Sequence, residues 1–489
     1  MKEYNYNWKY LISISVISAL GGLLFGYDFV VIGGAKPFYE PFFGITGSPA
    51  LQGWVMSCAL IGCLGGAFFS GWFSDRFGRK KLLIASASLF IIASLGTGGA
   101  QTLNAFVLFR IIGGIGIGLA SNLSPMYIAE ITPGKIRGAF VSINQLTIVI
   151  GILAAQIINW RIARPVPGGA TIADILASWN GQSGWRWMFF ACALPAILFF
   201  VAMWFVPESP RWLAKNKFSR AKAHKVLSRI GGSEYADSEL ISIENTFETG
   251  RGQKEGGTIF TPAILKLLVL GIVLAVFQQW CGINVIFNYA QEVFAGAGYS
   301  VSDTLLNIVI TGSVNLIFTF IGMFTVDRIG RKALMLLGAG GLAGIFAVVG
   351  GMYFFNIKGI LLLIMVVSSI ACYAMSLAPV TWVILSEIFP NRVRGTAMAV
   401  ATFSLWAGCF TLTYTFPLLN HALNASGTFW LYGIICVLGF WYILKKLPET
   451  RGRSLEEIER EMVRGTREGV IAASSPITAA ESNIGNIVQ

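Results

Sequence analysis

Charged residues are scarce in this sequence of 489 residues. Asp, Glu, Lys and Arg together make up 12% of it and hydrophobic residues 55%, whereas soluble domains carry about twice that charge fraction. The two histidines, His224 and His421, have no acidic or cysteine partners nearby in sequence, and the seven cysteines lack metal-ligand spacing. No nucleophile–base pair or phosphate-binding loop appears either. The composition excludes an ordinary soluble protein, and we expect neither enzyme activity, a metal nor a cofactor.

The sequence contains long apolar runs instead. A helix that crosses the hydrocarbon core of a membrane needs about 20 apolar residues. Runs of this kind cover residues 10–36, 51–73, 82–101, 104–128, 139–160, 185–206, 262–290, 302–326, 333–355, 358–386, 396–419 and 426–446. We therefore predict an all-α membrane protein with twelve transmembrane helices.

The formal net charge of +12 does not indicate a nucleic-acid site, because of where the charge lies. If the N-terminus and every even-numbered connection lie on one side, that side holds nearly all Lys and Arg residues. Arg110 falls within a span, and the opposite side holds Lys36, Arg161, Arg164, Arg186 and Lys358. Cytoplasmic loops carry such an excess of basic residues. We expect a multi-pass protein of the cell membrane, with both termini cytoplasmic, the lipid bilayer as a partner and no nucleic acid.

Three short motifs occur twice, about half a chain length apart. They are Asp75-Arg76-Phe77-Gly78-Arg79 with Asp327-Arg328-Ile329-Gly330-Arg331, Glu130-Ile131 with Glu387-Ile388, and Pro207-Glu208 with Pro448-Glu449. Ordered pairs of this kind indicate two six-helix halves in parallel repeat, as found in transporters. We predict an N-terminal half (1–206), a cytoplasmic helical linker (207–257), a C-terminal half (258–447) and a cytoplasmic tail (448–489). The residues beyond Arg464 are expected to be disordered.

Four amide side chains lie inside the apolar segment 262–290, namely Gln278, Gln279, Asn284 and Asn288. An amide without a partner in an apolar medium costs several kcal/mol, and amides suit a ligand made of hydroxyls. On a straight helix Gln278 and Asn284 would lie about 240° apart. They reach one ligand only if the helix breaks, for which Cys281-Gly282 is the expected place. The alternative is that the amides join helices, at about 1 kcal/mol per hydrogen bond.

Asp28 is the only acidic residue deep within a predicted span, and Arg110 is the only comparably deep base. A charge at mid-membrane costs about 2.5–3.5 kcal/mol on insertion scales. Their positions along the first and fourth spans place both in the outer half of the membrane, so we expect them to meet. The pair is either a permanent structural ion pair or a titrating acid near a substrate path.

These motifs make the family recognisable. The chain resembles the sugar porter family of the major facilitator superfamily over essentially its whole length, and in particular the bacterial xylose–proton symporters. The matching segments are Gly26-Tyr27-Asp28, Asp75-Arg76-Phe77-Gly78-Arg79, Pro207-Glu208-Ser209-Pro210-Arg211, the segment from Gln278 to Asn284, Pro379-Val380-Thr381-Trp382, Ser386-Glu387-Ile388-Phe389-Pro390 and Pro448-Glu449-Thr450-Arg451-Gly452. The resemblance implies the major facilitator fold and a sugar site between the halves.

The resemblance also suggests the residues that bind the sugar. They are Phe25, Gln145, Gln278, Gln279, Asn284, Asn315, Trp382 and Trp406. Amides would bond the sugar hydroxyls, and the indole rings would cover the apolar side of the sugar ring. Without the resemblance, the two tryptophans would be interpreted as core or membrane-interface residues. Similar facilitators have Asn where Asp28 stands, which makes Asp28, with Arg110, the candidate for proton coupling.

A further set of charged residues is implied to form ion pairs at the cytoplasmic gate. The set consists of Arg79, Glu130, Arg137, Glu208 and Arg211 in the first half, with Arg331, Glu387, Arg394 and Glu449 in the second. Such pairs would hold the inner gate shut while the sugar site faces outward. The alternative is static surface bridges, worth about 0–1 kcal/mol each.

Three residues depart from the family's pattern. Asn288 replaces the first of two tyrosines, Leu405 replaces a polar residue before the eleventh-span Trp, and Ala378 replaces a Gly before the tenth-span Pro. The first two weaken any transfer of sugar specificity and outer gating, and the third would stiffen a hinge.

We therefore expect alternating-access transport of a monosaccharide, a pentose or hexose such as xylose or glucose. The expected driving force is symport with a proton, and the protein is expected to work as a monomer. A facilitative sugar uniporter is the alternative, and a sugar sensor that does not transport is a third possibility.

Overall fold

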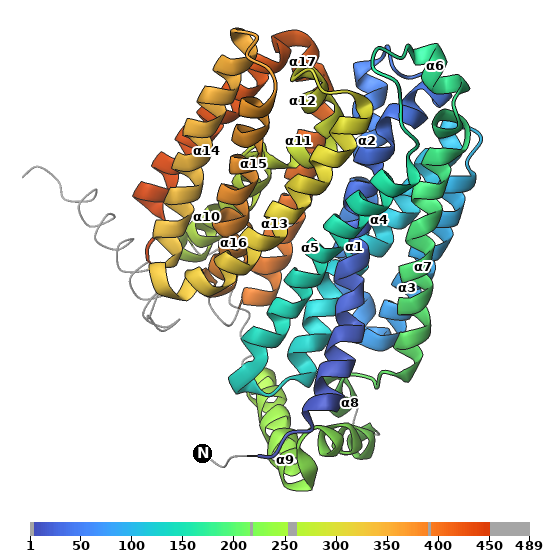
Figure 1. Ribbon diagram of the computed structural model, residues 1–489. Coiled ribbons are helices and arrows are strands. Elements are labelled where there is room, and N and C mark those ends of the chain that lie inside the picture. The colour runs from blue at the N-terminus through green and yellow to red at the C-terminus, as the bar shows by residue number, and fades with distance from the viewer. Residues whose placement is uncertain (1–3, 216–218, 253–261, 390–392, 450–489) are drawn as a thin grey trace, which may run out of the picture.

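The computed structural model describes residues 4–215, 219–252, 262–389 and 393–449, without the side chains of 135, 246–252, 262–263, 327, 386 and 394–395. Figure 1 shows two groups of long helices side by side, with α8 and α9 projecting at the end where the N-terminus lies. The described residues contain no β-strand. The tail expected to be disordered lies outside the described residues.

The N-terminal half contains six long helices. They are α1 (Trp8–Phe43), α2 (Pro49–Phe77), α3 (Arg79–Gly99), α4 (Leu103–Ile131), α5 (Arg137–Ile162) and α7 (Trp185–Phe205). A 3₁₀ turn (η1, Gly134–Ile136), a short helix (α6, Ile172–Ala177) and a π-helical turn (η2, Asn180–Gly184) lie in the connections. Each predicted span of this half corresponds to one long helix.

The linker forms two helices, α8 (Pro210–Lys215) and α9 (Arg220–Gly252). The helical path of α9 is interrupted at Gly231 and at Gly232, which has φ 85°. The sequence predicts a helix end at this pair, since glycine accepts the left-handed backbone. The N–H of Asn7 donates to the carbonyl of Ile230 at 2.8 Å, which ties the start of the chain to α9.

The C-terminal half is more interrupted. It consists of α10 (Pro262–Trp280), α11 (Ile283–Asn288), α12 (Ala290–Gly296), α13 (Val301–Ile329), α14 (Arg331–Phe354), α15 (Ile360–Met375), α16 (Leu377–Ile388) and α17 (Arg394–Lys446). Within the described ranges, eleven segments are long and apolar enough to cross a membrane, and the last of them has 51 residues. Non-helical angles at Asn424 (φ 58°, ψ 175°) divide that segment in two. The twelve predicted spans are thereby confirmed.

One predicted boundary is wrong. The first span is predicted to end at Lys36, where the apolar run stops, but α1 continues to Phe43. The helix continues because the ammonium of Lys36 is buried beside Glu40, one turn further on, at 3.4 Å. It ends at Gly44, whose φ of 65° is left-handed and favours glycine.

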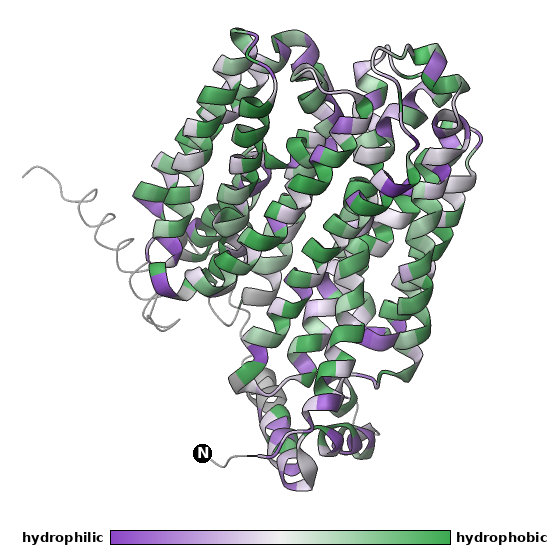
Figure 2. Ribbon diagram, viewed as in Figure 1, coloured by the Kyte–Doolittle hydropathy of each residue, from purple (hydrophilic) through white to green (hydrophobic). Residues whose placement is uncertain are grey.

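Close packing within a half depends on small residues. A Cβ atom on Gly26 of α1 would collide with the carbonyl oxygen of Ile148 on α5, so the two backbones approach closely only because Gly26 has no side chain. The halves meet where α2 packs against α17, α5 against α13, and α1 against α11. Figure 2 shows hydrophobic residues over the long helices, and hydrophilic residues gathered on α8 and α9.

Candidate sugar site and ion pairs

The predicted break in the amide-bearing span lies at Gly282. Helix α10 ends at Trp280, Gly282 has φ 89° and ψ −9°, and α11 begins at Ile283. A Cβ atom on Gly282 would lie 2.9 Å from the Cβ of Tyr432. Both the left-handed backbone and the close neighbour require glycine here. The expected break is confirmed.

Three amides form a hydrogen-bonded chain across this break, called the amide chain below. Gln279 Nε2 donates to Gln278 Oε1 at 3.1 Å, and Asn284 Nδ2 donates to Gln279 Oε1. Gln278 Nε2 also donates to the carbonyl of Ala378 at 3.4 Å. All three side chains are buried. The break therefore allows Asn284 to reach residues that a straight helix would place on another face.

The amide chain contacts α17 about one helical turn from Trp406, and the ring of Trp406 contacts that of Phe25 in the other half. Asn284 Nδ2 lies 4.0 Å from Cys409 Sγ, three residues beyond Trp406 on α17. The ring of Trp406 lies 5.5 Å from that of Phe25 on α1, centroid to centroid. Trp406 Nε1 is buried and has no hydrogen-bond partner within the described part of the chain. An unpaired buried donor costs about 1–3 kcal/mol, and a ligand oxygen would remove that cost.

The other predicted sugar-site residues come from three further helices. Gln145 lies on α5, Asn315 on α13 and Trp382 on α16. Asn315 is buried, Gln145 is partly buried and Trp382 is 37% exposed. Helices α5 and α13 pack against each other across the halves, which brings two of these helices to the same interface. Among the described residues, no hydrogen bond joins these three side chains to the amide chain. All eight predicted residues are uncharged, which favours a neutral ligand.

Asp28 and Arg110 meet as the sequence predicts. Arg110 Nη1 donates to Asp28 Oδ1 at 2.9 Å and to Oδ2 at 2.8 Å. Both residues are almost fully buried, with 4% and 3% of their surfaces exposed. The guanidinium also lies 5.8 Å from the ring centre of Phe189 on α7. The pair therefore sits among helices of the N-terminal half, one helical turn along α1 from Phe25.

The predicted gate residues of the N-terminal half form a connected network. Arg79 Nη2 lies 2.9 Å from Glu130 Oε1, and Ser209 Oγ donates to Glu130 Oε2. Glu208 Oε1 accepts the backbone N–H groups of Arg79, Lys80 and Ser209 at 2.9–3.1 Å. Burial raises the pKa of Glu208 above its usual value, while the three N–H groups act in the opposite direction.

The C-terminal half repeats this arrangement with the equivalent residues. Arg331 Nη2 lies 3.1 Å from Glu387 Oε1. Glu449 accepts the backbone N–H of Arg331 at 2.9 Å and that of Lys332 at 3.1 Å. The motif pairs found in the sequence thus form the same contacts in both halves. Each of these contacts joins residues of one half, and none of them bridges the two halves.

The other predicted gate residues stand apart from these networks. Arg137 is exposed and Arg211 is partly buried, and neither belongs to an ion pair among the residues that the structure describes. The side chain of Arg394 lies outside the described part. The difference follows from where the two helices begin. Arg79 begins α3 beside Glu130 and Glu208, whereas Arg137 begins α5 on the surface.

The sequence reasoning missed a buried ion cluster at the opposite end of α1. Lys36 Nζ pairs with Glu40 on α1 and with Glu292 on α12. It also lies 4.7 Å from the ring centre of Tyr289, and Gln52 Nε2 donates to Glu40 Oε2 at 3.3 Å. We call these five residues the Lys36 cluster. The spacing of Lys36 and Glu40 by four residues was the available signal, but the partner on α12 is 256 positions from Lys36 in the chain.

The three departures from the family pattern occupy defined positions. Asn288 is buried, and its Oδ1 has no partner within the described residues. Leu405 is buried beside Trp406. Ala378 follows the break between α15 and α16, where Ser376 has φ −121° and ψ −84°. The backbone in this region is thus interrupted although Ala replaces Gly, and the stiffening of the hinge stays a prediction.

Comparison with known proteins agrees with this geometry. The sugar (and other) transporter family matches residues 14–462. The chain belongs to this family. It is 39% identical to the D-xylose-proton symporter of Escherichia coli (strain K12), over 93% of this chain and 96% of that protein, and 36% identical to the arabinose-proton symporter of Bacillus subtilis (strain 168), over 93% and 96%.

A solved structure shows the same fold. It is the partially occluded inward-open conformation of the xylose transporter XylE from E. coli, with a TM-score of 0.80 at 36% identity, covering 91% of this chain and 100% of that one. The chain therefore has the major facilitator fold, and it is a membrane transporter, not an enzyme.

Proposed function

We propose that this protein carries a monosaccharide, a pentose or hexose, across the cell membrane by alternating access together with a proton. The observation that carries the proposal is that the amide chain contacts α17 one helical turn from Trp406, whose ring meets that of Phe25 at the interface of the two halves. Amides that donate and accept hydrogen bonds fit hydroxyl groups. Aromatic faces fit the C–H side of a sugar ring. The two named symporters to which the chain is similar support the same substrate class.

Asp28 is the proposed proton carrier. Its carboxylate is buried against Arg110. Burying charged groups in the membrane is costly, and ionisable residues found there usually have a function. Movement of Arg110 away from Asp28 during the cycle would leave the buried carboxylate without its counter-charge. Asp28 would then take up a proton from outside as the sugar binds and release it inside.

The cycle needs two rigid halves that rock about the sugar site. We propose that the halves are residues 1–206 and 258–447, that 207–257 is a cytoplasmic linker and 448–489 a cytoplasmic tail, and that both termini face the cytoplasm. The basic residues of α8, α9 and the adjoining loops support this orientation, since cytoplasmic loops are enriched in Lys and Arg. The lipid bilayer surrounds a monomer in this proposal.

Uptake into proteoliposomes tests the proposal and its alternative. Labelled xylose, arabinose and glucose are supplied with an imposed inward proton gradient. We expect accumulation of at least one sugar, since each charge that crosses 100 mV gains about 2.3 kcal/mol, enough for about fiftyfold concentration. Asp28→Asn should lose accumulation but keep exchange of labelled for unlabelled sugar. Asp303→Asn, an exposed acid at the start of α13, is the matched control and should behave as wild type.

The close, buried contact between Asp28 and Arg110 also favours a specific alternative. In this alternative the ion pair is structural, and the protein is a facilitative uniporter. Wild-type protein that equilibrates sugar but never concentrates it would support the uniporter. Accumulation that persists in Asp28→Asn would keep symport and place the proton site elsewhere. Sugar binding with no flux of any kind would indicate a sensor.

A further inference from the structure

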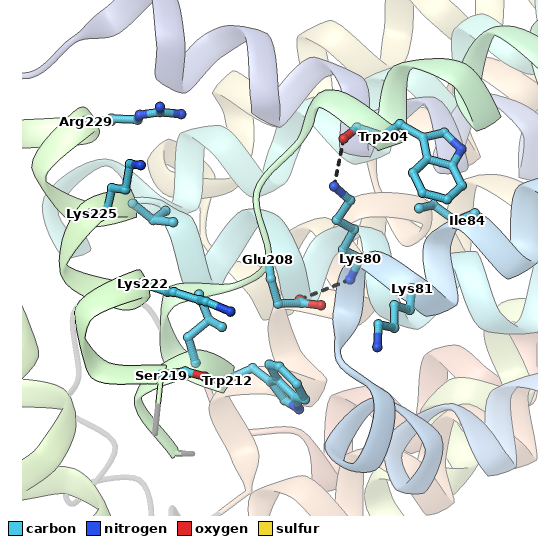
Figure 3. A pocket seen from close by; sticks show the side chains of 12 residues that line it. Lys80, Lys81, Ile84, Trp204, Glu208, Trp212, Ser219, Lys222, Lys225 and Arg229 are labelled. Carbon is cyan, nitrogen blue, oxygen red and sulfur yellow. Dashed lines mark hydrogen bonds between the residues drawn. The ribbon is translucent and has the colours of Figure 1, made fainter. Parts of the chain in front are cut away.

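A basic hollow lies where the linker meets the N-terminal half. It has a volume of about 860 Å³ and is lined by Lys80 and Lys81 from α3, Lys222, Lys225 and Arg229 from α9, and Trp204 and Trp212, among others. Figure 3 shows the three basic side chains of α9 extending from that helix on the side of Lys80 and Glu208. Their spacing of three and four residues puts all three on one face of α9. The sugar site is not involved, so the transport proposal leaves this hollow without a role.

Within the described part of the chain, the basic side chains that line the hollow outnumber the acidic ones. Glu208 is the only acidic residue that lines it, and its Oε1 already accepts three backbone N–H groups. Among the described residues, Lys81, Lys222, Lys225 and Arg229 have no ion-pair partner. Lys80 Nζ donates to the carbonyl of Trp204 at 2.8 Å. Like charges that converge without a counter-charge repel one another, so an anion would stabilise this arrangement.

The hollow borders an apolar surface on one side. Helix α7 ends at Phe205, and an exposed hydrophobic stripe runs along it through Leu194, Leu198, Val201 and Phe205. Trp204, which lines the hollow, is 59% exposed. Tryptophan is enriched at the boundary between hydrocarbon and headgroups. A ligand placed here meets basic side chains at one end and an apolar stripe at the other.

We propose that this hollow binds the phosphate headgroup of an anionic phospholipid of the cytoplasmic leaflet, with its acyl chains along the stripe on α7. Basic pockets on the cytoplasmic side of membrane proteins suit such headgroups. The lipid phosphate joins α3 to α9, next to the backbone N–H groups of Arg79 and Lys80 that hold Glu208. The bound lipid therefore fastens the linker to the N-terminal half.

Native mass spectrometry of the full-length protein tests this proposal. Delipidated protein is titrated with phosphatidylglycerol or phosphatidylcholine, and bound lipid is counted. We expect preferential binding of phosphatidylglycerol, and a loss of affinity of about 150-fold in Lys222→Gln/Lys225→Gln/Arg229→Gln, because each of the three basic residues contributes about 1 kcal/mol toward an anionic lipid. The control Lys9→Gln/Lys445→Gln/Lys446→Gln removes the same charge from exposed cytoplasmic positions and should bind as wild type.

The outcomes are distinct. Retained sugar binding in both triple variants shows that they fold. Equal phosphatidylglycerol binding by the two triple variants would overturn the proposal, since total charge, and not the hollow, would then determine binding. Displacement of the lipid by soluble glycerol phosphate at similar concentration would also overturn it, because a free phosphate ester would then be the ligand.

We further propose that the Lys36 cluster locks the outer ends of the two halves together. Lys36 belongs to α1 of the N-terminal half, and its partner Glu292 belongs to α12 of the C-terminal half. The backbones also touch here, because a Cβ atom on Gly33 would lie 3.0 Å from the carbonyl oxygen of Phe287. Lys36 is 1% exposed. A buried ammonium requires partners, so separation of α12 from α1 leaves Lys36 with only Glu40.

Labelling from the outside tests the lock. A cysteine at Phe29, whose ring lies next to that of Phe25, is treated with a membrane-impermeant thiol reagent in a cysteine-free background. We expect Lys36→Met to label about tenfold faster than wild type, the factor that corresponds to about 1.4 kcal/mol of lost attraction between the halves. Glu292→Gln should have the same effect, and the swap Lys36→Glu/Glu292→Lys should restore slow labelling. If Lys36→Met is labelled at the same rate as wild type, the Lys36 cluster does not hold the two halves together.

Discussion

At the scale of single residues, the site is defined by polar groups that hydrocarbon cannot satisfy. Gln278, Gln279 and Asn284 satisfy one another in part through the amide chain, and their role in binding a sugar stays a prediction. They join α10 to α11, and they remain able to donate and accept further bonds. Trp406 Nε1, by contrast, has no partner in the described part of the chain. These unsatisfied groups indicate where a sugar hydroxyl would be bound.

The first prediction belongs to Gln278. Gln278→Ala should weaken sugar binding by about 1–3 kcal/mol, the usual cost of a lost buried hydrogen bond. Calorimetry with the sugar identified by uptake measures this change. Gln101→Ala removes an exposed amide at the outer end of α3 and serves as the control. Wild-type affinity in Gln278→Ala would exclude this residue from the site.

At the scale of elements, interruptions are as important as helices. The span of α10 and α11 breaks at Gly282, and that of α15 and α16 at Ser376. Both breaks lie close to the amide chain, because Gln278 Nε2 donates to Ala378. Backbone that leaves the helical path inside a membrane needs protein or a cavity around it. The amide chain therefore lies where two broken spans of the C-terminal half come together.

The second prediction concerns the break at Gly282. Gly282→Ala should destabilise the protein by about 1–3 kcal/mol, since it adds left-handed strain and a close contact with Tyr432. Sugar affinity should fall as well, because Asn284 depends on the break for its position. Thermal unfolding in the presence and absence of sugar measures both effects.

Gly65→Ala is the matched control for this substitution, because a Cβ atom on Gly65 of α2 has no neighbour within 4 Å. Alanine should be tolerated there. If Gly282→Ala unfolds at the wild-type temperature and binds sugar equally well, the break does not need glycine.

At the scale of the whole molecule, internal repetition determines the arrangement. Arg79, Glu130 and Glu208 in one half correspond to Arg331, Glu387 and Glu449 in the other, and the two sets form equivalent contacts. These contacts hold together the end of each half at which the motifs lie. A gate between the two halves stays a prediction.

The third prediction addresses these networks. If they favour the outward-facing state, loss of one shifts the population inward by the energy lost. Spin labels at Ala139 and Lys446, exposed near the start of α5 and at the end of α17, report the distance between the halves. Glu387→Ala should raise the fraction of longer distances, and Glu130→Ala should do the same. An unchanged distance distribution in both variants would mean that the bridges are only structural.

The sequence alone determined the class of protein, the number of spans and the repeat. Apolar runs, the scarcity of charge and motifs spaced half a chain apart are local or periodic signals, and they need no three-dimensional contact to be detected. It also determined the break at Gly282, since two amides cannot share a ligand on a straight helix.

Apart from pairs that the sequence predicts, such as Asp28 with Arg110, only the tertiary structure decided which side chains meet. The Lys36 cluster and the basic hollow at α9 depend on helices that are distant in the chain. An apolar pattern shows that a face is buried, but not which helix covers it. The end of α1 illustrates the reason, because Lys36 ends the apolar run in the sequence, whereas in the fold its charge is matched by Glu40 and by Glu292 from the other half, so the helix continues.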